Sequence, residues 1–322
     1  MFGIGAAVGR TCRHQKVVAA GAVVHYAMLD VFPALLDLFE MPTISIGMPV
    51  YNRPELLKQA LDSLLNQTFK DFEILISDNA SPNPLVQEMC EEHARRDPRI
   101  RYVRQPTNIG AFNNLKYVYE NCNSEYFMWA ADDDLRENTF IERGVKALNA
   151  DSSKAAWFCE LDGIKFDGTP AQHIASVGPF ASRGNKRIEL IRYMMGSGPK
   201  MMLVYSIFRH PTLREPIEFL THNHQIPGAD FVLMYVYVSR HDITIDDNVL
   251  FHYRFHDQDR QSRVKAPKRM FANRHFAGYW NGASFTPYPI MTRCLIPVRY
   301  LVYLTNKLGI SIGKRWRRLR RS

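Results

Sequence analysis

Three adjacent carboxylates are the first groups in this chain that could do chemistry. Asp132, Asp133 and Asp134 come just after the apolar run Tyr126–Ala130. Adjacent carboxylates repel one another and are costly to bury without a cation. A hard divalent ion such as Mg²⁺ or Mn²⁺ prefers oxygen ligands and often shares them with phosphates. The cluster therefore predicts a metal site that faces phosphate, and the alternative is a solvated acidic loop at the start of a helix.

A fourth carboxylate, Asp78, directly follows the apolar run FEILIS. At the end of a strand it could accept hydrogen bonds from a nucleobase or a ribose. It could equally close an Asx turn with Asn79 and Ser81. The spacing alone leaves both interpretations open.

Strand and helix patterns alternate from Met41 onward, and these elements must position the carboxylates. The predicted strands are Thr43–Val50, Phe72–Ser77, Ile100–Gln105 and Tyr126–Ala130, and the predicted helices between them are Pro54–Asn66, Leu85–Arg96 and Phe112–Cys122. Such alternation predicts an α/β fold with a mostly parallel central sheet flanked by helices. Because ligands bind beyond the carboxyl ends of parallel strands, we expect the polar groups at three strand ends to converge on one site.

The pattern after Asp151 is less regular. Two strands, Ala155–Phe158 and Ile164–Phe166, are predicted around a turn at Asp167-Gly168. Helices are predicted at Lys186–Met195 and Phe231–Ser239, and a last strand at Asn248–Arg254.

The composition is that of a globular protein, with 46% hydrophobic and 23% charged residues among 322. The net charge of +9 is concentrated at the C-terminal end, because no Asp or Glu follows Asp259 while fifteen Lys and Arg residues do. The five cysteines are widely spaced and form no CxxC pair, which favours a reducing compartment, the cytoplasm, over a disulfide framework or a zinc site.

An ordered set of motifs resembles the inverting family 2 glycosyltransferases of the GT-A fold, the nucleotide-diphospho-sugar transferase fold. The matching stretches are SIGMPVYNRPELLKQALDSLLNQTFKDFEILISDNAS, then NIGAFNNL and EYFMWAADDDL, and the resemblance extends from about Pro42 to Ser262. It implies transfer of a sugar from a nucleotide-diphosphate sugar, with a UDP-sugar favoured, to a glycan or lipid-linked acceptor.

The resemblance also implies roles for residues that bind the donor. The loop of Pro49, Val50, Tyr51 and Asn52 lines the base, and Asp78 accepts hydrogen bonds from a uracil-type edge. Asn108 and Gly110 match a second signature of the family, although the Arg that often ends it is missing here.

The aspartates hold the metal and the donor diphosphate in this comparison. The family often has DxDD, and Ala131 stands where its first Asp would be. We assign Asp133 and Asp134 to the metal and Asp132 to the donor, and the resemblance leaves open which two form the working pair.

Three further residues take their roles from the resemblance. Asp230 lies where the family places its catalytic base, which takes the proton of the acceptor hydroxyl. An N-cap is the structural alternative, since Asp230 precedes an apolar helix. In the Tyr-Arg-x-His pattern, Arg254 neutralises diphosphate charge as the nucleotide leaves, and His256 completes the metal shell or serves only a structural purpose.

The predicted organisation has three parts. Residues 1–41 form a poorly defined extension, 42–262 the catalytic domain, with a nucleotide-binding half (42–135) and an acceptor half (136–262), and 263–322 a basic segment. Within that segment the apolar residues of Tyr288–Leu308 and the six basic residues of Lys314–Arg321 predict an amphipathic helix on an anionic membrane surface. The alternative is a helix packed on the domain with a solvated basic end.

Two other functions fit the pattern less well. A non-catalytic nucleotide-sugar binder would not need Asp230 beside the aspartate cluster. A sugar nucleotidylyltransferase would need a Gly-rich loop after the first strand, where this chain has PVYNRPE. No nucleic-acid partner is expected, since the basic tail contains a single aromatic residue, Trp316, and no known RNA- or DNA-binding motif.

Overall fold

The computed structural model of the chain describes residues 41–171, 174, 176–196, 198–222, 229–255 and 277–307, without the side chains of 222, 229, 230 and 302–307. The chain divides into two compact units, Met1–Met41 and Pro42–Ser322. All elements described below belong to the second unit.

Eight strands form one mixed sheet in the order β3-β2-β1-β4-β7-β6-β8-β5. Four of its seven neighbouring pairs are parallel: β1 with β2, β1 with β4, β2 with β3, and β6 with β8. The strands are β1 (Ile44–Val50), β2 (Phe72–Asp78), β3 (Ile100–Arg104), β4 (Tyr126–Trp129), β5 (Leu135–Arg136), β6 (Ala156–Ile164), β7 (Ile207–Arg209) and β8 (Ile243–Arg254). The predicted α/β fold with a mostly parallel sheet is confirmed.

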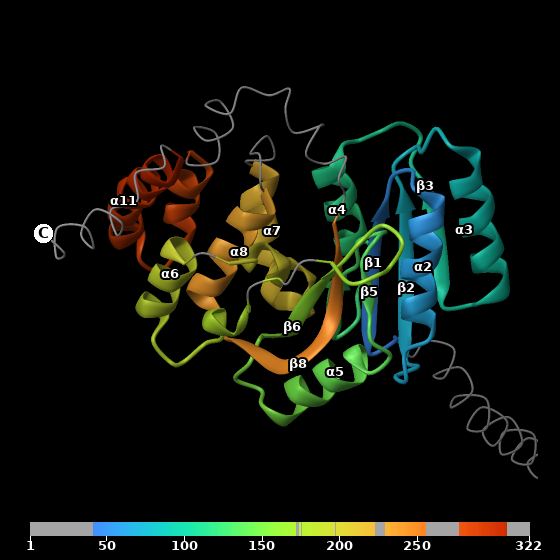
Figure 1. Ribbon diagram of the computed structural model, residues 1–322, viewed down its shortest axis with the longest axis horizontal. Helices are drawn as coiled ribbons and strands as arrows, with labels where there is room; N and C mark the ends of the chain where they lie inside the picture. The colour runs from blue at the N-terminus through green and yellow to red at the C-terminus, as the bar shows by residue number, and fades with distance from the viewer. Residues whose placement is uncertain are drawn as a thin grey trace, which may run out of the picture. The chain divides into compact units, whose positions relative to one another are not determined.

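Helices connect the strands of the parallel half: the first joins β1 to β2, the second joins β2 to β3, and the third returns from β3 to β4 on the other side of β1. These helices are α2 (Pro54–Leu65), α3 (Pro84–Arg96) and α4 (Ala111–Glu120). Helices α2 and α4 lie on opposite faces of the sheet (Figure 1). Each of these strands and helices agrees with its predicted range to within two residues, because both faces of the sheet are covered and the strands are therefore continuously apolar.

The second half carries the remaining helices, which gather around the other end of the sheet (Figure 1). They are α5 (Phe140–Ala150), α6 (Lys186–Met195), α7 (Arg214–His222), α8 (Ala229–Arg240) and α11 (Pro289–Lys307). Short 3₁₀ turns occur at Gly178–Phe180, Lys200–Tyr205, His210–Leu213 and Ala283–Phe285.

The predicted hairpin after Asp151 is wrong. A single nine-residue strand, β6, replaces its two strands and pairs in parallel with β8 along its whole length. The turn at Asp167-Gly168 does form, with Gly168 at φ 84° and its N–H donating to the carbonyl of Lys165. The turn brings residues 169–171 back against the end of β6, while pairing with the distant strand β8 extends the first predicted strand to Ile164.

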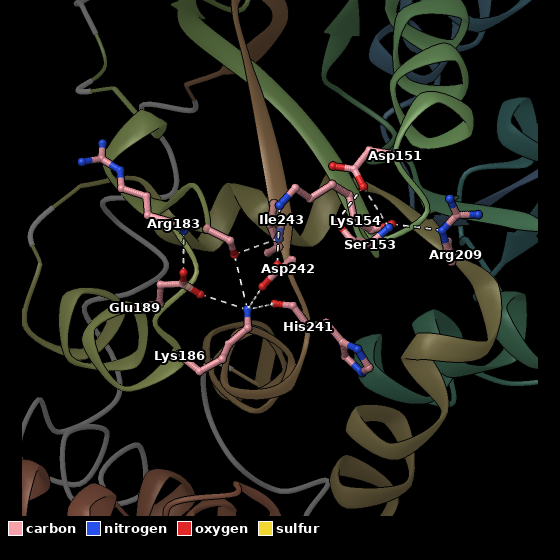
Figure 2. A network of polar contacts seen from close by, with 11 residues as sticks. Asp151, Ser153, Lys154, Arg183, Lys186, Glu189, Arg209, His241, Asp242 and Ile243 are labelled. Atoms are coloured by element: carbon pink, nitrogen blue, oxygen red, sulfur yellow. Dashed lines mark hydrogen bonds and ion pairs between the residues drawn. The ribbon is translucent and has the colours of Figure 1, made fainter.

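A polar network fixes the start of helix α6. Figure 2 shows Lys186, at the start of α6, in the centre of this network. Its ammonium pairs with Asp242 and donates to Glu189 (2.9 Å) and to the carbonyl of His241 (2.6 Å). The start of α6, the end of α8 and the start of β8 are thereby tied together.

In the part of the chain that the structure describes, no helix has the length and apolar character needed to cross a bilayer. Helix α11 contains Pro297 and exposes Ile290 and Leu301 to solvent. Its opposite side is packed, since Thr292 and Ile296 are buried.

Candidate functional site

The ends of β1, β2 and β4 bring the predicted polar groups together. The parallel register pairs Val50 with Asp78, so the residues that follow these strands start side by side. The N–H of Asn52 donates to Ser81 Oγ (2.9 Å), and the N–H of Tyr51 donates to Asp132 Oδ2 (3.4 Å). Residues from three separate strand ends are thus in direct contact.

Arg53 lies against the aspartates. Its Nη1 donates to Asp133 Oδ2 at 2.5 Å, and its Nη2 pairs with Asp132 Oδ1. Both Asn52 and Arg53 have left-handed backbone conformations, with φ of 62° and 63°. Non-glycine residues adopt this conformation uncommonly, and they do so most often at functional sites.

Asp132 and Asp134 are nearly inaccessible to solvent. Burial raises the pKa of Asp132 to about 7, although the positive charge of Arg53 opposes this shift. Burial and the charge of Asp133 raise the pKa of Asp134 to about 8. Asp134 Oδ1 accepts from the N–H of Arg254 (2.9 Å), while its Oδ2 has no hydrogen-bond partner. A hard cation, which prefers oxygen ligands, could supply the partner that this buried carboxylate oxygen lacks.

Arg254 is fully buried and anchors the backbone of the loop that carries the aspartates. Its Nε donates to the carbonyl of Asp133 (2.7 Å), and its Nη1 donates to the carbonyls of Lys165 (2.9 Å) and Phe166 (2.6 Å). Its Nη2 donates to Gln59 Oε1 on α2 (2.9 Å). The structure therefore gives this guanidinium a positioning contact, and the predicted contact with a diphosphate would require it to leave these partners.

Asp78 is completely buried, and both of its oxygens have partners. Oδ1 accepts from the N–H of Ser81 (2.8 Å), which is the Asx turn that the sequence left as an alternative. Oδ2 accepts from Tyr102 Oη (3.0 Å) and from Arg104 Nη1 (2.5 Å). Tyr102 and Arg104 were not predicted at this site. The signal that could have found Arg104 is the parallel register, which pairs it with Asp78.

Asn108 and Gly110 join the loop that follows Asp78. Asn108 Oδ1 accepts from Asn79 Nδ2 (3.0 Å) and from the N–H of Gly110 (2.9 Å). Gly110 has φ 85° at the start of α4, a conformation that favours glycine. The nearby Val50 is buried, Pro49 is half-buried and the Tyr51 ring is exposed, so of these three Tyr51 is the most open to a ligand.

Two predicted residues are described in part or not at all. The backbone of Asp230 lies in the first turn of α8, which begins at Ala229, so the prediction that Asp230 precedes the helix as its cap is wrong by about one residue. An acidic residue is favourable within a first turn as well as before it. The side chain of Asp230 and all of His256 lie outside the described residues.

The described aspartates do not form a ready-made metal cage. Among the residues described, no three His, Cys, Asp or Glu side chains are grouped so that they could hold a metal ion. The chemistry of the donor set still fits a hard cation, because Asp132 and Asp133 already bind the positive charge of Arg53 and Asp134 has the unpartnered oxygen.

Comparisons with known proteins concern the family and the fold of the chain. Residues 45–208 match the family model described as Glycosyl transferase family 2. An uncharacterised glycosyltransferase of Rickettsia felis is 25% identical over 228 residues, which cover 69% of this chain and 36% of the relative. A chondroitin synthase of Escherichia coli is 28% identical over 132 residues, which cover 41% of this chain and 19% of the synthase. The chain thus spans about a third of the length of the Rickettsia relative.

Among solved structures, S. aureus TarS 1–349 in complex with UDP-GlcNAc has a TM-score of 0.61 at 14% identity, covering 84% of this chain and 76% of TarS 1–349. A second structure of TarS 1–349 has a TM-score of 0.53 at 12% identity, with 83% and 92% covered. At this level of identity the likeness concerns the fold.

Proposed function

The chain belongs to glycosyl transferase family 2, and from this premise we propose that it transfers a sugar, with inversion, from a nucleotide-diphosphate sugar to a glycan or lipid-linked acceptor. The observation that carries the proposal is the cluster of buried aspartates in contact with the loop after β1, which in turn contacts the loop after β2. A transferase needs such features side by side: loops at the strand ends that can hold a nucleotide, and carboxylates that place a cation on its diphosphate.

A divalent cation, Mg²⁺ or Mn²⁺, would be held by Asp133 and Asp134, with Asp132 close by and His256 as a further ligand. When bound, it would offset the negative charge that develops on the diphosphate as the sugar departs. Arg254 holds the aspartate loop in position for this task, since its N–H donates to the carboxylate of Asp134 and its Nε donates to the backbone carbonyl of Asp133.

The donor base would lie between the Tyr51 ring and the loops of Asp78 and Asn108. We favour a UDP-sugar because Asp78 resembles the residue that accepts from a uracil-type edge in this family. To bind a base, Asp78 would exchange one of its present partners, and Arg104 is the more exposed of the two that share Oδ2.

Asp230 would act as the general base. In the first turn of α8 its carboxylate would take the proton of the acceptor hydroxyl as that oxygen attacks the anomeric carbon. The likeness to a chondroitin synthase supports a glycan acceptor and a role in polysaccharide biosynthesis.

The experiment that tests the proposal is a screen of UDP-, GDP- and dTDP-sugars with Mn²⁺, in which released nucleotide is measured. We expect release from at least one donor and its loss in Asp134→Asn. Leu85→Ala, a change at an exposed position on α3, serves as the control and should behave like the wild type. Binding of a donor without any turnover, with or without added glycans, would instead support the non-catalytic binder.

We further propose that α11 lies on an anionic membrane surface on the cytoplasmic side. Ile290 is 79% exposed and Leu301 is 62% exposed, an unfavourable arrangement in water unless another surface covers them. The predicted basic cluster Lys314–Arg321 lies outside the described residues, and its charge would favour anionic lipids. The described cysteines, Cys90, Cys122, Cys159 and Cys294, are free thiols, in keeping with a reducing compartment.

Co-sedimentation with vesicles tests the membrane proposal. The full chain should bind phosphatidylglycerol vesicles more than phosphatidylcholine vesicles, and Ile290→Glu or Leu301→Glu should reduce this binding. Leu85→Glu is the matched control, because it places the same charge at another exposed apolar position. Equal binding by all four proteins, or binding that ignores salt, would contradict the proposal.

A further inference from the structure

Arg53 pairs with one of the two aspartates that we assign to the metal. Its guanidinium contacts one oxygen of Asp133 and one oxygen of Asp132, so it supplies these carboxylates with a positive charge. A divalent ion on Asp133 and Asp134 would compete with this guanidinium for Asp133, and the two cations would repel each other. Binding of the ion should therefore weaken the contact between Arg53 and the aspartates.

The side chain of Arg53 is more accessible than the two aspartates with which it pairs. It is 43% exposed, against 3% for Asp132 and 12% for Asp133. Its backbone is held, since its carbonyl accepts the N–H of Leu57 in the first turn of α2. A change of partner by the guanidinium would therefore leave the backbone in place.

Arg53 belongs to the loop that follows β1. Arg53 follows Tyr51 and Asn52, whose backbone N–H groups bind Asp132 and Ser81 at the strand ends. A guanidinium can bind phosphate oxygens in the same bidentate geometry in which it binds a carboxylate. A diphosphate bound beside the aspartates would therefore offer the Arg53 guanidinium a second anionic partner.

We propose that Arg53 exchanges between two anions: it neutralises Asp132 and Asp133 in the free enzyme, and it binds the donor diphosphate once a divalent cation has bound Asp133 and Asp134. This inference rests on the proposed function. It makes Arg53 a donor-binding residue and makes binding of metal and nucleotide cooperative, because the metal releases the group that the nucleotide then uses. Such coupling acts equally in both directions.

Removal of the guanidinium should have opposite effects on the two ligands. In Arg53→Gln, Mn²⁺ no longer competes with a resident cation, so its affinity for the nucleotide-free protein should rise about fivefold or more. UDP affinity at saturating Mn²⁺ should fall by a similar factor, since a diphosphate contact is lost. Arg53→Lys should lie between the wild type and Arg53→Gln for both ligands.

The test measures free Mn²⁺ by electron paramagnetic resonance and UDP and GDP binding by calorimetry, on proteins shown to be folded by circular dichroism. Arg99→Gln is the control, because Arg99 has a comparable ion pair with Asp97 away from the site, and it should change neither affinity. Mn²⁺ affinity that is unchanged or weaker in Arg53→Gln, or absent from both proteins, overturns the exchange. Failure of either nucleotide to bind the wild type would count against the proposed function, while the Mn²⁺ measurement would still decide whether Arg53 competes for the carboxylates.

Discussion

The burial of Asp134 is unfavourable for the stability of the folded protein. Asp134 is buried beside another carboxylate, and one of its oxygens has no hydrogen-bond partner. Such a group is costly in a folded protein unless something compensates for its charge. Its presence is most easily understood through a ligand, and function is the usual reason for destabilising groups in otherwise well-packed regions.

Replacing this carboxylate should separate metal binding from folding. We expect Asp134→Asn, and likewise Asp133→Asn, to weaken Mn²⁺-dependent UDP binding about tenfold or more, because each removes an anionic ligand. The metal-free Asp134→Asn protein should be at least as stable as the wild type at pH 7, since the amide replaces a carboxyl whose ionisation is disfavoured by burial. Calorimetry and urea denaturation measure the two effects. Full activity of the wild-type protein in a chelator would contradict the metal role.

Asp230 makes a prediction that concerns rate rather than binding. Asp230→Asn should leave UDP affinity near that of the wild type while kcat falls roughly 10²–10⁴-fold, the usual contribution of a general base. Asn serves as well as Asp at a helix start, so a structural role would survive the change. A fall in kcat of less than about tenfold would show that Asp230 serves only the helix.

At the scale of elements, the two halves of the sheet hold the site by different means. The parallel strands β1, β2 and β4 place polar residues at one edge through their register. In the second half the strand pairings are short or shifted in register. Polar side chains such as Arg254 and the Lys186 network connect its elements.

Lys186 should contribute to the free energy of unfolding because it joins the start of α6, the end of α8 and the start of β8. We expect Lys186→Met to lower the free energy of unfolding by about 1–3 kcal/mol, because Glu189, Asp242 and the carbonyl of His241 lose their shared partner. Lys58→Met is the control, since Lys58 forms an exposed pair with Asp62 on α2 and such pairs contribute about 0–1 kcal/mol. Equal losses in urea denaturation would show that the network is not a structural anchor.

Lys200 makes the stability depend on pH. Its buried ammonium donates to the carbonyls of Met194 (3.3 Å) and Gly196 (3.2 Å) at the end of α6. Burial, with a smaller contribution from the charge of Arg299, lowers its pKa to about 7. The unfolded chain, with a lysine pKa of about 10.4, then binds more protons than the folded chain between pH 7 and 10.

The free energy of unfolding should therefore rise with pH across this window, by up to about 1.4 kcal/mol per pH unit. Lys200→Met should remove this contribution to the slope. Urea denaturation of both proteins at pH 7, 8 and 9 measures it, and parallel profiles for the two proteins would contradict the assignment.

For the whole molecule, the boundary at Met41 is the main organisational feature. The chain separates there into two compact units, and every described element of the sheet belongs to the second. The recognisable motifs also begin just after this point, at SIGMPVYN.

A chain that begins at Met41 should fold and retain its activity. We expect cooperative thermal unfolding with a midpoint within a few degrees of the full chain, because the core strands and their helices are all present. The same donor screen gives the activity of both chains. Loss of cooperative unfolding in the shorter chain would show that residues before Met41 contribute to the core.

The sequence by itself determined the parallel half of the fold and the place of its carboxylates. Continuous apolar runs and helical periodicity are local signals, and the aspartates begin two residues after the predicted strand that ends at Ala130. The same local signals failed at Ala155–Phe166, where a turn was present but β8 supplied the partner.

Only the tertiary structure decided what the charged groups of the site contact. Arg53 meets Asp133 across a sequence separation of 80 residues, and Arg254 meets the same aspartate across 121. Arg254 was predicted to face a diphosphate, yet its donors are taken up by backbone carbonyls and Gln59 in the interior. No local pattern specifies such pairings, because they depend on how the strands are ordered and on which side of the sheet each long side chain is buried.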